Sequence, residues 1–261
     1  MKRTNLRKQM IQLIPIQIKK KKKIFDLPHL ITSTGFIFKD NDIIIVSSKF
    51  VSISEGAILD LSYVKVSSEA KNLSEKYYMD PRIAEIVLRD SDTIFGGLPG
   101  FLLAVKNGVL APNAGIDKSN VPENQIICLP ANAFYSAEKI RLHFLIEYGI
   151  KVGVVISDSR LMPTRIGTVG VAVGCAGIEP VEDLRGHKDL YGNIMKYTLK
   201  ANADSLATMG TFLMGESDES IPVVVVRGAK IPLTDRNLSW RDLAIEYNDD
   251  IYLRGMNLIN Q

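Results

Sequence analysis

One stretch of the sequence constrains the fold more than any other: KVGVVISDSR, from Lys151 to Arg160. Val152–Ile156 form a short run of apolar, mostly β-branched residues, a pattern that predicts a fully buried strand. Asp158 and Ser159 follow where the predicted strand ends. Scaffolds present functional side chains where a rigid element gives way to a loop. We therefore expect a core strand that delivers a carboxylate and a hydroxyl to one edge of a sheet.

Further strands and helices surround this segment in an irregular order. Predicted strands lie at Ile14–Ile18, Asp42–Ile53, Val169–Val173 and Ile221–Gly228, and a hairpin over Phe101–Pro112 turns at Asn107-Gly108. Predicted helices cover Glu69–Tyr78, Pro81 to Arg89 behind the cap Asp80, Ser136 to the closing Gly149, Tyr197–Met214 and Leu238–Asn257, while GGLPGF (96–101) is interpreted as a loop. Because no regular βαβ alternation is present, the predicted fold class is α+β, with mixed sheets and packed helices.

Length and composition are typical of a soluble globular protein. The chain has 261 residues, 46% of them hydrophobic and 23% charged, enough to bury a core in one large domain or two small ones. No repeat or linker divides it, so residues 1–261 are interpreted as a single unit of one or two intimately packed lobes. No apolar run reaches the roughly 18 to 20 residues of a membrane span, and MIQLIPIQI lacks a signal-peptide cleavage site.

The two cysteines, Cys128 and Cys175, indicate the compartment. They are far apart, have no metal or redox spacing, and lie in apolar surroundings. This usage is typical of buried free thiols in a reducing compartment. We therefore expect a cytoplasmic protein without a membrane partner.

The net charge of +3 is concentrated in one run, Lys19–Lys23. Without the five charges of this run, the rest of the chain carries −2. Aromatic residues make up 7% of the chain and none lies within the run, whereas nucleic-acid binding needs a wider basic surface with stacking partners. We therefore expect no nucleic-acid partner. Two interpretations of the lysines stay open: a solvated edge that blocks strand aggregation, or attraction of an anionic ligand.

Four polar clusters interrupt the apolar segments, each where a predicted element ends. They are SSK at 47–49, NAGIDKSN at 113–120, SDSR at 157–160 and MGESDES at 214–220. Three of them contribute the carboxylates Asp117, Asp158 and Glu216. If these met they would repel one another unless a cation lay between them, and oxygen ligands suit Mg²⁺ or Mn²⁺. Ser159 would add a hydroxyl ligand.

Phosphate would be the natural companion of such a metal site. Lys49, Arg165 and the backbone near Gly215 would hold the phosphate oxygens. The alternative is that the three acids are unrelated and serve caps and turns, places that Asp and Ser favour through local hydrogen bonds. Spacing alone favours this alternative.

Beyond these patterns, the sequence resembles a known family, the coenzyme F420-0:L-glutamate ligases, also called F420 gamma-glutamyl ligases. The resemblance covers most of the chain from about residue 40 to 230 and keeps the family's order of motifs, which together are highly specific. The motifs are SEG (54–56), NAGIDKSNV (113–121), SAEKIR (136–141), VGVVISDS (152–159), GTVGVAVG (167–174), RGHKDLYG (185–192), LMGE (213–216) and IPVVVVRG (221–228).

The resemblance implies a GTP-dependent amide ligase. In such an enzyme a divalent metal pair, Mg²⁺ or Mn²⁺ with K⁺ as a further candidate ion, helps to transfer the γ-phosphoryl group of GTP to a carboxylate of the deazaflavin precursor F420-0. The amine of L-glutamate then attacks the acyl phosphate and extends a γ-glutamyl tail. The implied fold is an α+β protein with a two-lobed protomer in an intertwined homodimer.

The motifs also imply which residues form the site. The metal ligands would be Asp117, Asp158, Ser159 and Glu216, with Ser159 in the place of a family threonine. The implied nucleotide contacts are Ser48, Lys49, Asn120, Met214, Gly215, Ser217, Asp218, Glu219, Ser220 and Ile221. Arg165 is the candidate catalytic residue.

Three departures from the family pattern concern the nucleotide and coenzyme contacts, while the metal ligands are intact. Ile53 replaces a lysine, Ile166 replaces an arginine, and PIQIKKKKK replaces a Gly-Leu-Pro loop. The lysine run is a candidate source of the missing cation. Two alternatives therefore stay open: a ligase for another carboxylate or for ATP, and a non-catalytic nucleotide- or coenzyme-binding homologue.

Overall fold

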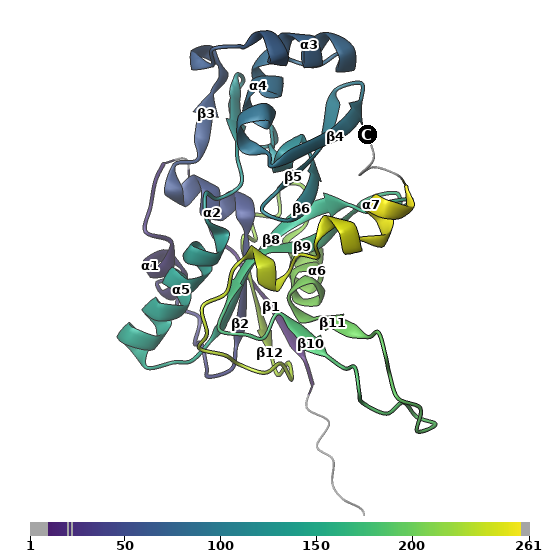
Figure 1. Ribbon diagram of the computed structural model, residues 1–261. Coiled ribbons are helices and arrows are strands. Elements are labelled where there is room, and N and C mark those ends of the chain that lie inside the picture. Colours follow the sequence, from purple (N-terminus) through teal and green to yellow (C-terminus); the bar gives the residue numbers. More distant parts are fainter. Residues whose placement is uncertain (1–9, 20, 22, 257–261) are drawn as a thin grey trace, which may run out of the picture.

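The computed structural model describes residues 10–19, 21 and 23–256 of the chain. At its centre is a five-stranded sheet with the order β1 (Gln12–Ile16), β12 (Val223–Arg227), β2 (Ile43–Ser47), β8 (Gly153–Leu161) and β9 (Thr168–Ala176) (Figure 1). β2 and β8 run parallel, and the other neighbouring strands run antiparallel. Strands from the two ends of the chain thus lie side by side in one mixed sheet.

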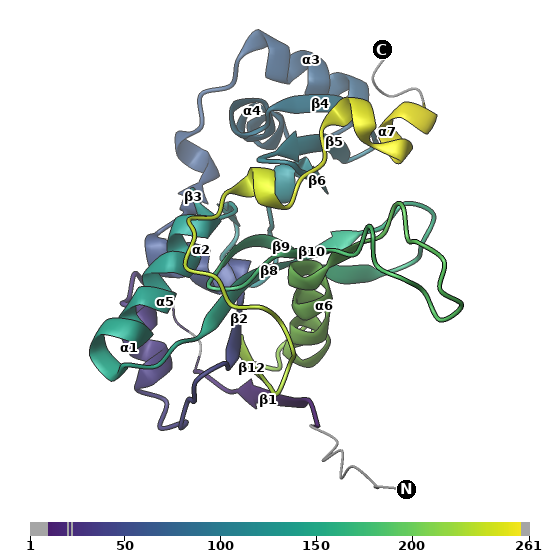
Figure 2. The ribbon, with the colours of Figure 1, turned by 60° about the horizontal axis from the view of Figure 1, so that its bottom comes forward.

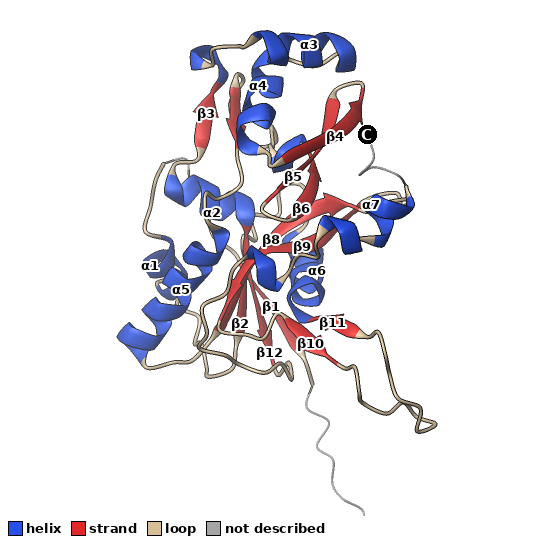
Figure 3. Ribbon diagram, viewed as in Figure 1, coloured by secondary structure: helices blue, strands red, loops and turns tan. Residues whose placement is uncertain are grey.

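Helices cover both faces of this sheet (Figure 3). Alternate residues of a strand face opposite sides, so Ile44 and Ile156 belong to one buried cluster, whereas Ile45 and Val155 belong to another. The first cluster is covered by α1 (Leu27–Thr32), α2 (Ser48–Glu55) and α5 (Ala133–Tyr148), and the second by α6 (Asn202–Met214). The sheet is therefore buried between two helical layers.

A second region, at the top of Figure 1, has its own core. Ile86, Leu102 and Ile126 are fully buried there. The region contains an antiparallel sheet of β4 (Thr93–Leu98), β5 (Phe101–Lys106) and β6 (Val109–Pro112), the helices α3 (Ser68–Tyr77) and α4 (Pro81–Asp90), the strand pair β3 (Ile58–Asp60) and β7 (Gln125–Ile127), and the 3₁₀ turns η1 (Leu61–Tyr63) and η2 (Asn113–Gly115).

A long hairpin projects from the body of the molecule (Figures 1 and 2). Its base is the pair β10 (Val181–Asp183) and β11 (Leu199–Ala201), and we call residues 181–201 the β10–β11 arm. Within the arm, Arg185 is ion-paired with Asp183 at 2.6 Å, and Asp189 accepts a hydrogen bond from the Asn193 N–H at 2.8 Å. Local contacts therefore shape a segment that leaves large apolar side chains exposed.

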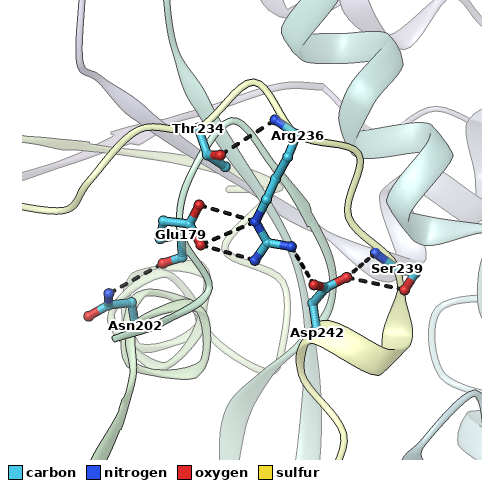
Figure 4. Close-up of polar contacts among 6 residues, drawn as sticks. All are labelled: Glu179, Asn202, Thr234, Arg236, Ser239 and Asp242. Atoms are coloured by element: carbon cyan, nitrogen blue, oxygen red, sulfur yellow. Dashed lines mark hydrogen bonds and ion pairs between the residues drawn. The ribbon is translucent and has the colours of Figure 1, made fainter. Parts of the chain in front are cut away.

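The segment after β12 runs along the outside of the protein to the second region (Figure 2). Arg236 anchors it, because its guanidinium pairs with Glu179 at 3.0 Å and with Asp242 at 2.5 Å (Figure 4). Further along, the Tyr247 ring packs edge-on against Phe95 of β4. The elements of this segment are η3 (Trp240–Asp242), η4 (Tyr247–Asp249) and α7 (Ile251–Gly255).

The structure confirms the α+β class and most of the predicted elements. Asp80 caps α4, Asn107-Gly108 turns the β5–β6 hairpin, and Gly149 closes α5 in a left-handed conformation. The strand predicted at Val152–Ile156 is present and continues to Leu161. The two-lobed protomer and the homodimer stay predictions. Among the described residues, no helix is both long and apolar enough to cross a membrane.

The strand predicted over Asp42–Ile53 is wrong in its second half. β2 ends at Ser47, and the next eight residues form α2, which Gly56 closes with a φ of 76°. The helix turns Phe50 and Val51 into the cluster on one face of the sheet. Burial in this cluster overrides the β-preference of the individual residues, which depends strongly on context.

Two other boundaries also differ from the prediction. GGLPGF is not all loop, because β4 extends to Leu98 and only Pro99-Gly100 make the turn. A Cβ on Gly97 would overlap the carbonyl of Phe101, so this glycine permits the close pairing of β4 with β5. The helix predicted from Tyr197 begins only at Asn202, after β11.

The long helix predicted over Leu238–Asn257 is wrong in the described residues, which end at 256. Only Ile251–Gly255 are α-helical, and two 3₁₀ turns precede them. The segment connects the central sheet with the second region (Figure 2). An extended chain advances about 3.3 Å per residue and an α-helix only about 1.5 Å, so a largely non-helical path spans this distance with fewer residues.

Candidate active site

One end of the five-stranded sheet opens into a cavity of about 470 Å³. Ile16, Val223, Val46 and Ile156 lie opposite one another across the neighbouring strands β1, β12, β2 and β8. The segments just beyond this row line the cavity, together with residues that follow β6 in the second region. Four strand ends and one loop therefore contribute side chains to the same space.

Asp158 lies on the part of β8 that extends past this row. Its carboxylate accepts a hydrogen bond of 2.5 Å from the hydroxyl of Ser48, at the start of α2. Burial raises the pKa of Asp158 to about 6, and nearby Asp117 adds to the rise, although the bond from Ser48 acts in the opposite direction. A negative charge on Asp158 is thus less favourable in the protein than in water, and a neighbouring cation would stabilise it.

Asp117 reaches the cavity from the second region, after a turn with an uncommon backbone. Asn113, Ala114 and Gly115 have φ values of 50°, 53° and 76°, a left-handed stretch that asparagine and glycine adopt most readily. Asp117 then exchanges two main-chain hydrogen bonds with Ile127, of 2.9 and 2.8 Å. The turn and the bonds to β7 together fix the position of the aspartate.

The side chain of Asp117 is ion-paired with Lys49, with 2.5 Å between Oδ2 and Nζ. Ser119 donates two hydrogen bonds to the same carboxylate, from its N–H at 2.6 Å and from its hydroxyl at 3.0 Å. Burial acts to raise the pKa of Asp117, but these donors outweigh it and the pKa is lowered. Asp117 is therefore a stable carboxylate, and Lys49 is the cation beside it.

Glu216 enters the cavity from the segment that joins α6 to β12. Its Oε1 accepts hydrogen bonds from the hydroxyls of Ser159, at 2.7 Å, and Thr168, at 3.0 Å. These hydroxyls come from the hairpin of β8 and β9. The chain leaves α6 through Gly215 with a φ of 71°, a value that favours glycine. Glu216 is thereby placed against the end of β8.

The cavity brings together most of the predicted site residues. Its lining includes the four predicted metal ligands and, of the predicted nucleotide contacts, Ser48, Lys49, Asn120, Met214, Gly215, Ser217, Asp218, Ser220 and Ile221. The side-chain amide of Asn120 donates to the Ser217 carbonyl at 3.5 Å, which links the loop of the second region to the segment after α6.

Two predicted site residues are not part of this lining. The carboxylate of Glu219 folds back and accepts a hydrogen bond of 2.9 Å from the N–H of Ser217. Arg165 is exposed in the loop between β8 and β9. The binding roles of the lining residues, and the roles of Glu219 and Arg165, stay predictions.

Sequence reasoning did not single out Ser119, Thr168 or Lys21 as site residues, although all three line the cavity. Ser119 follows Asp117 by two residues, the spacing of an Asx turn, and this was an available signal. Thr168 lies opposite Leu161 in the β8–β9 pairing. A predicted strand that ends at Ile156 therefore gives no indication that Thr168 belongs to the site. Lys21 belongs to the lysine run, whose sequence gives no indication of which member faces inward.

The donor atoms of the cavity fit a hard divalent cation in kind. Carboxylate and hydroxyl oxygens, as in Asp117, Asp158, Ser159 and Glu216, are the ligands that Mg²⁺ and Mn²⁺ prefer. In the part of the chain that the structure describes, however, no three acidic, histidine or cysteine side chains lie close enough to share one ion. The acids bond instead to Lys49 and to hydroxyl groups. Metal binding therefore stays a prediction.

Comparison with known proteins places the chain among the ligases. The family model described as F420-0:Gamma-glutamyl ligase matches residues 14–228. A protein of Methanocaldococcus jannaschii named coenzyme F420:L-glutamate ligase is 39% identical over 215 residues, which are 82% of this chain and 85% of the relative. Proteins with the same name from Methanopyrus kandleri and Archaeoglobus fulgidus are each 37% identical over 206 residues, covering 78% and 79% of this chain and 81% and 82% of theirs.

The chain is therefore a ligase enzyme. More narrowly, it belongs to the F420-0:gamma-glutamyl ligase family, and the resemblance found in the sequence motifs is confirmed. The matched range runs from within β1 to the end of β12 and contains nearly every element that borders the cavity, including α2, β8 and α6.

Proposed function

We propose that the protein adds L-glutamate, in a γ-glutamyl ligase reaction, to the deazaflavin precursor F420-0, and that the reaction consumes GTP and requires Mg²⁺ or Mn²⁺. The family and the names of its relatives support the substrate class. One structural observation carries the rest: Asp117, Asp158, Ser159, Glu216 and Lys49 line a single cavity. Such a set is suited to binding phosphate together with its counter-ions.

The proposed reaction has two steps. A carboxylate oxygen of the precursor attacks the γ-phosphorus of GTP, the bond from this phosphorus to the β–γ bridging oxygen breaks, and GDP leaves. The amine of L-glutamate then attacks the acyl carbon and loses a proton, while the phosphate departs with one oxygen of the original carboxylate. Both steps depend on positioning and on charge neutralisation more than on a side-chain nucleophile.

The charge of the cavity supports the need for added cations. Its described lining contains the carboxylates of Asp117, Asp158, Glu216 and Asp218 but only two ammonium groups, those of Lys21 and Lys49. This excess of negative charge would repel a triphosphate. A divalent ion bound by the predicted ligand oxygens would neutralise phosphate and carboxylate charge together and so supply Lewis-acid assistance.

The chain's own groups would hold and orient the nucleotide. α2 begins at Ser48 beside the cavity, and no side chain of the described residues caps its N-terminus. The free N–H groups in the first turn of a helix attract anions. Lys49 adds a cation to the same turn. We propose that these groups, with Asn120 and the segment Met214–Ile221, contact GTP, and that Arg165 contacts phosphate or the anionic coenzyme.

Isotope transfer tests both the activity and the acyl phosphate. The precursor, labelled with ¹⁸O in its carboxylate, is incubated with the protein, GTP, L-glutamate and Mg²⁺. We expect a glutamylated product by mass spectrometry and ¹⁸O in the released phosphate. Product formation with unlabelled phosphate would reject the acyl phosphate. The absence of product with Mg²⁺ and with Mn²⁺ would reject the ligase assignment for this substrate.

A second candidate is a ligase that uses ATP or another carboxylate. Ile53 favours it, because this residue places an apolar side chain in the lining of the same cavity. Calorimetry with Mg²⁺ and each nucleotide distinguishes the candidates, since tighter binding of ATP than of GTP would favour the second one. Metal-dependent nucleotide binding without turnover on any carboxylate would favour a non-catalytic homologue instead.

We propose further that the protein forms a homodimer. On the β10–β11 arm, Leu190, Tyr191 and Tyr197 are 101%, 92% and 89% exposed, and Phe212 on α6 is 82% exposed. An excess of large exposed apolar side chains commonly marks an interface. Sedimentation equilibrium is expected to give twice the chain mass of 28.9 kDa, and Tyr191→Asp is expected to shift the protein toward monomer. A monomeric wild-type protein would reject the dimer.

A further inference from the structure

Lys21 is a cavity cation that has no carboxylate partner among the described residues. Lys49, the other ammonium group of the lining, is ion-paired with Asp117 at 2.5 Å. None of the ion pairs formed by the described residues includes Lys21. We propose that Lys21 binds the phosphate groups of the nucleotide substrate, an inference that rests on the proposed nucleotide-dependent ligase activity.

Main-chain hydrogen bonds fix the course of the chain shortly before this lysine. Beyond β1, the N–H of Ile18 donates to the carbonyl of Ser220 at 3.1 Å, so the chain that leads to Lys21 runs beside the segment that enters β12. On the other side of this segment, the N–H of Ser47 donates to the Pro222 carbonyl at 2.9 Å. Ile18 and the N-cap of α2 therefore flank the same short stretch of chain, and Lys21 follows Ile18 by three residues.

Asp158 lies at a different strand end from the segment that leads to Lys21. Asp158 extends from β8, which is separated from β1 by β12 and β2. Adjacent strands lie about 4.8 Å apart, so three spacings separate the ends of β1 and β8 by about 14 Å. Lys21 thus adds to the lining a positive charge that is not ion-paired with any acid of the described residues. A triphosphate is an extended anion and can contact both the α2 N-terminus and a cation beside it.

Neighbouring lysines of the same run behave differently. Lys19 and Lys23 are exposed, whereas Lys21 is half-buried and lines the cavity with Ile18 and Ile221. Packing a lysine stem against apolar groups restricts the side chain while the ammonium group stays accessible. A run that served only to keep a surface charged would not need one member to face inward. This difference makes Lys23 the matched control for Lys21.

Equilibrium binding of GTP with Mg²⁺, measured by calorimetry without the precursor, tests the inference on the full chain. The variants are Lys21→Ala, Lys21→Arg and Lys23→Ala. For one lost charged hydrogen bond, we expect Lys21→Ala to weaken GTP binding about tenfold or more. Lys21→Arg should retain most of the affinity, and Lys23→Ala should stay within about twofold of wild type because exposed charges are screened. Guanosine, which has no phosphate, should bind all four proteins equally.

The outcomes separate this inference from the function on which it rests. Equal GTP affinity of Lys21→Ala and wild type would overturn it, as would an equal loss in Lys23→Ala or a matching loss for guanosine. A raised KM for the precursor with unchanged GTP binding would assign the lysine to the other substrate and would also overturn it. A wild-type protein that binds no GTP would overturn the proposed function, and this inference with it.

Discussion

The cavity at the end of the central sheet and a second cavity, beside the start of α5, are similar in size but not in chemistry. Their volumes are about 470 and 360 Å³. In its described lining the second cavity has one acid, Glu138, and one lysine, Lys106. Both are already ion-paired, Glu138 with Arg141 at 2.7 Å and Lys106 with Asp90 at 2.8 Å. Unbalanced charge, and not volume, distinguishes the candidate active site.

The contrast follows from which parts of a strand face each space. β9 contributes to both cavities: Thr168, at its start, lines the first, whereas Val173, Cys175 and Ala176, in its second half, line the second. A strand interior supplies side chains selected for packing, while strand ends and the loops after them are free to carry polar groups. The position of a residue along β9 therefore indicates whether its side chain is polar better than the volume of the adjacent cavity does.

Among substitutions that test this difference between the cavities, Asp158→Asn should have the largest effect on turnover. Asparagine has nearly the same size and can still accept the hydrogen bond from Ser48, but it removes the negative charge. Charge stabilisation by a metal site is worth several kcal/mol, so kcat should fall about 10³-fold, or ~4 kcal/mol. Initial rates of product formation measure this loss, and an unchanged melting temperature would show that the fold is intact.

The same chemical change in the second cavity is the control. Glu138→Gln removes one charge from a two-bond ion pair with Arg141, which keeps a second carboxylate partner in Asp235 at 3.2 Å. Turnover should stay within about twofold of wild type, because no substrate charge depends on this group. Wild-type turnover in Asp158→Asn, or an equal loss in both variants, would mean that the two cavities do not differ in the proposed way.

Substitutions of two glycines on β9, one near each cavity, allow the effect on stability to be compared with the effect on turnover. A Cβ on Gly170 would lie 2.4 Å from the carbonyl oxygen of Ala207, and a Cβ on Gly174 would lie 2.5 Å from the carbonyl carbon of Ala133. Gly170→Ala and Gly174→Ala should each lower the free energy of unfolding by about 1–3 kcal/mol, as overpacking does. Because Gly170 is paired with Ser159 across the hairpin, only Gly170→Ala should also reduce turnover per folded molecule.

Urea unfolding and initial rates of product formation, measured for both variants, test these predictions. A loss of turnover in Gly174→Ala as large as that in Gly170→Ala would contradict the functional separation of the two ends of β9. An unfolding free energy equal to wild type in both variants would show instead that the neighbouring helices move aside at little cost.

The sequence predicted single site residues better than the contacts between them. An apolar run that ends in Asp158 and Ser159 is a local signal, and the observed strand β8 agrees with it. The contacts that build the cavity are not local: Ser48 and Asp158 are 110 residues apart in the chain, and Ser159 and Glu216 are 57 apart. Their convergence could be expected only from the family resemblance, because spacing alone favoured unrelated caps and turns.

Predictions based on local preference were wrong where packing over a distance decides the conformation. Phe50 and Val51 have strong strand preferences, yet they lie in α2 because the helix brings them into a core cluster. Lys21 illustrates the same limit for the site. It lines the cavity three residues after Ile18, whose N–H bonds to the distant Ser220 carbonyl, a contact that no pattern within the lysine run could indicate.

Trp240→Ala tests the second cavity directly. Trp240 lines it, is half-buried, and lies under the Arg241 guanidinium at 4.7 Å from the ring centroid. Its loss should lower the free energy of unfolding by about 2 kcal/mol, less than the ~3–5 kcal/mol of a fully buried aromatic residue. KM for each substrate should not change. A raised KM with an unchanged melting temperature would show that the second cavity binds a substrate.

The smallest expected effect concerns the two thiols. Burial, with Asp242 and Asp204, raises the pKa of Cys175 to about 12, and burial with Asp90 raises the pKa of Cys128 to about 11. Only the thiolate reacts, so at pH 8 iodoacetamide should modify both cysteines far more slowly in the native protein than in the denatured chain, and the rates should increase as the pH is raised toward these values.

Mass spectrometry of the alkylated protein compares the modification rates of Cys175 and Cys128 within one molecule. Cys175 lines the second cavity although it is only 1% exposed, whereas Cys128 lies in the core of the second region. If the second cavity is a packing space, both thiols should react slowly as long as the protein stays folded. Rapid modification of Cys175 alone would mean that this cavity opens to solvent in the native state. The second cavity would then be able to admit a ligand, and unbalanced charge alone would no longer distinguish the candidate active site from it.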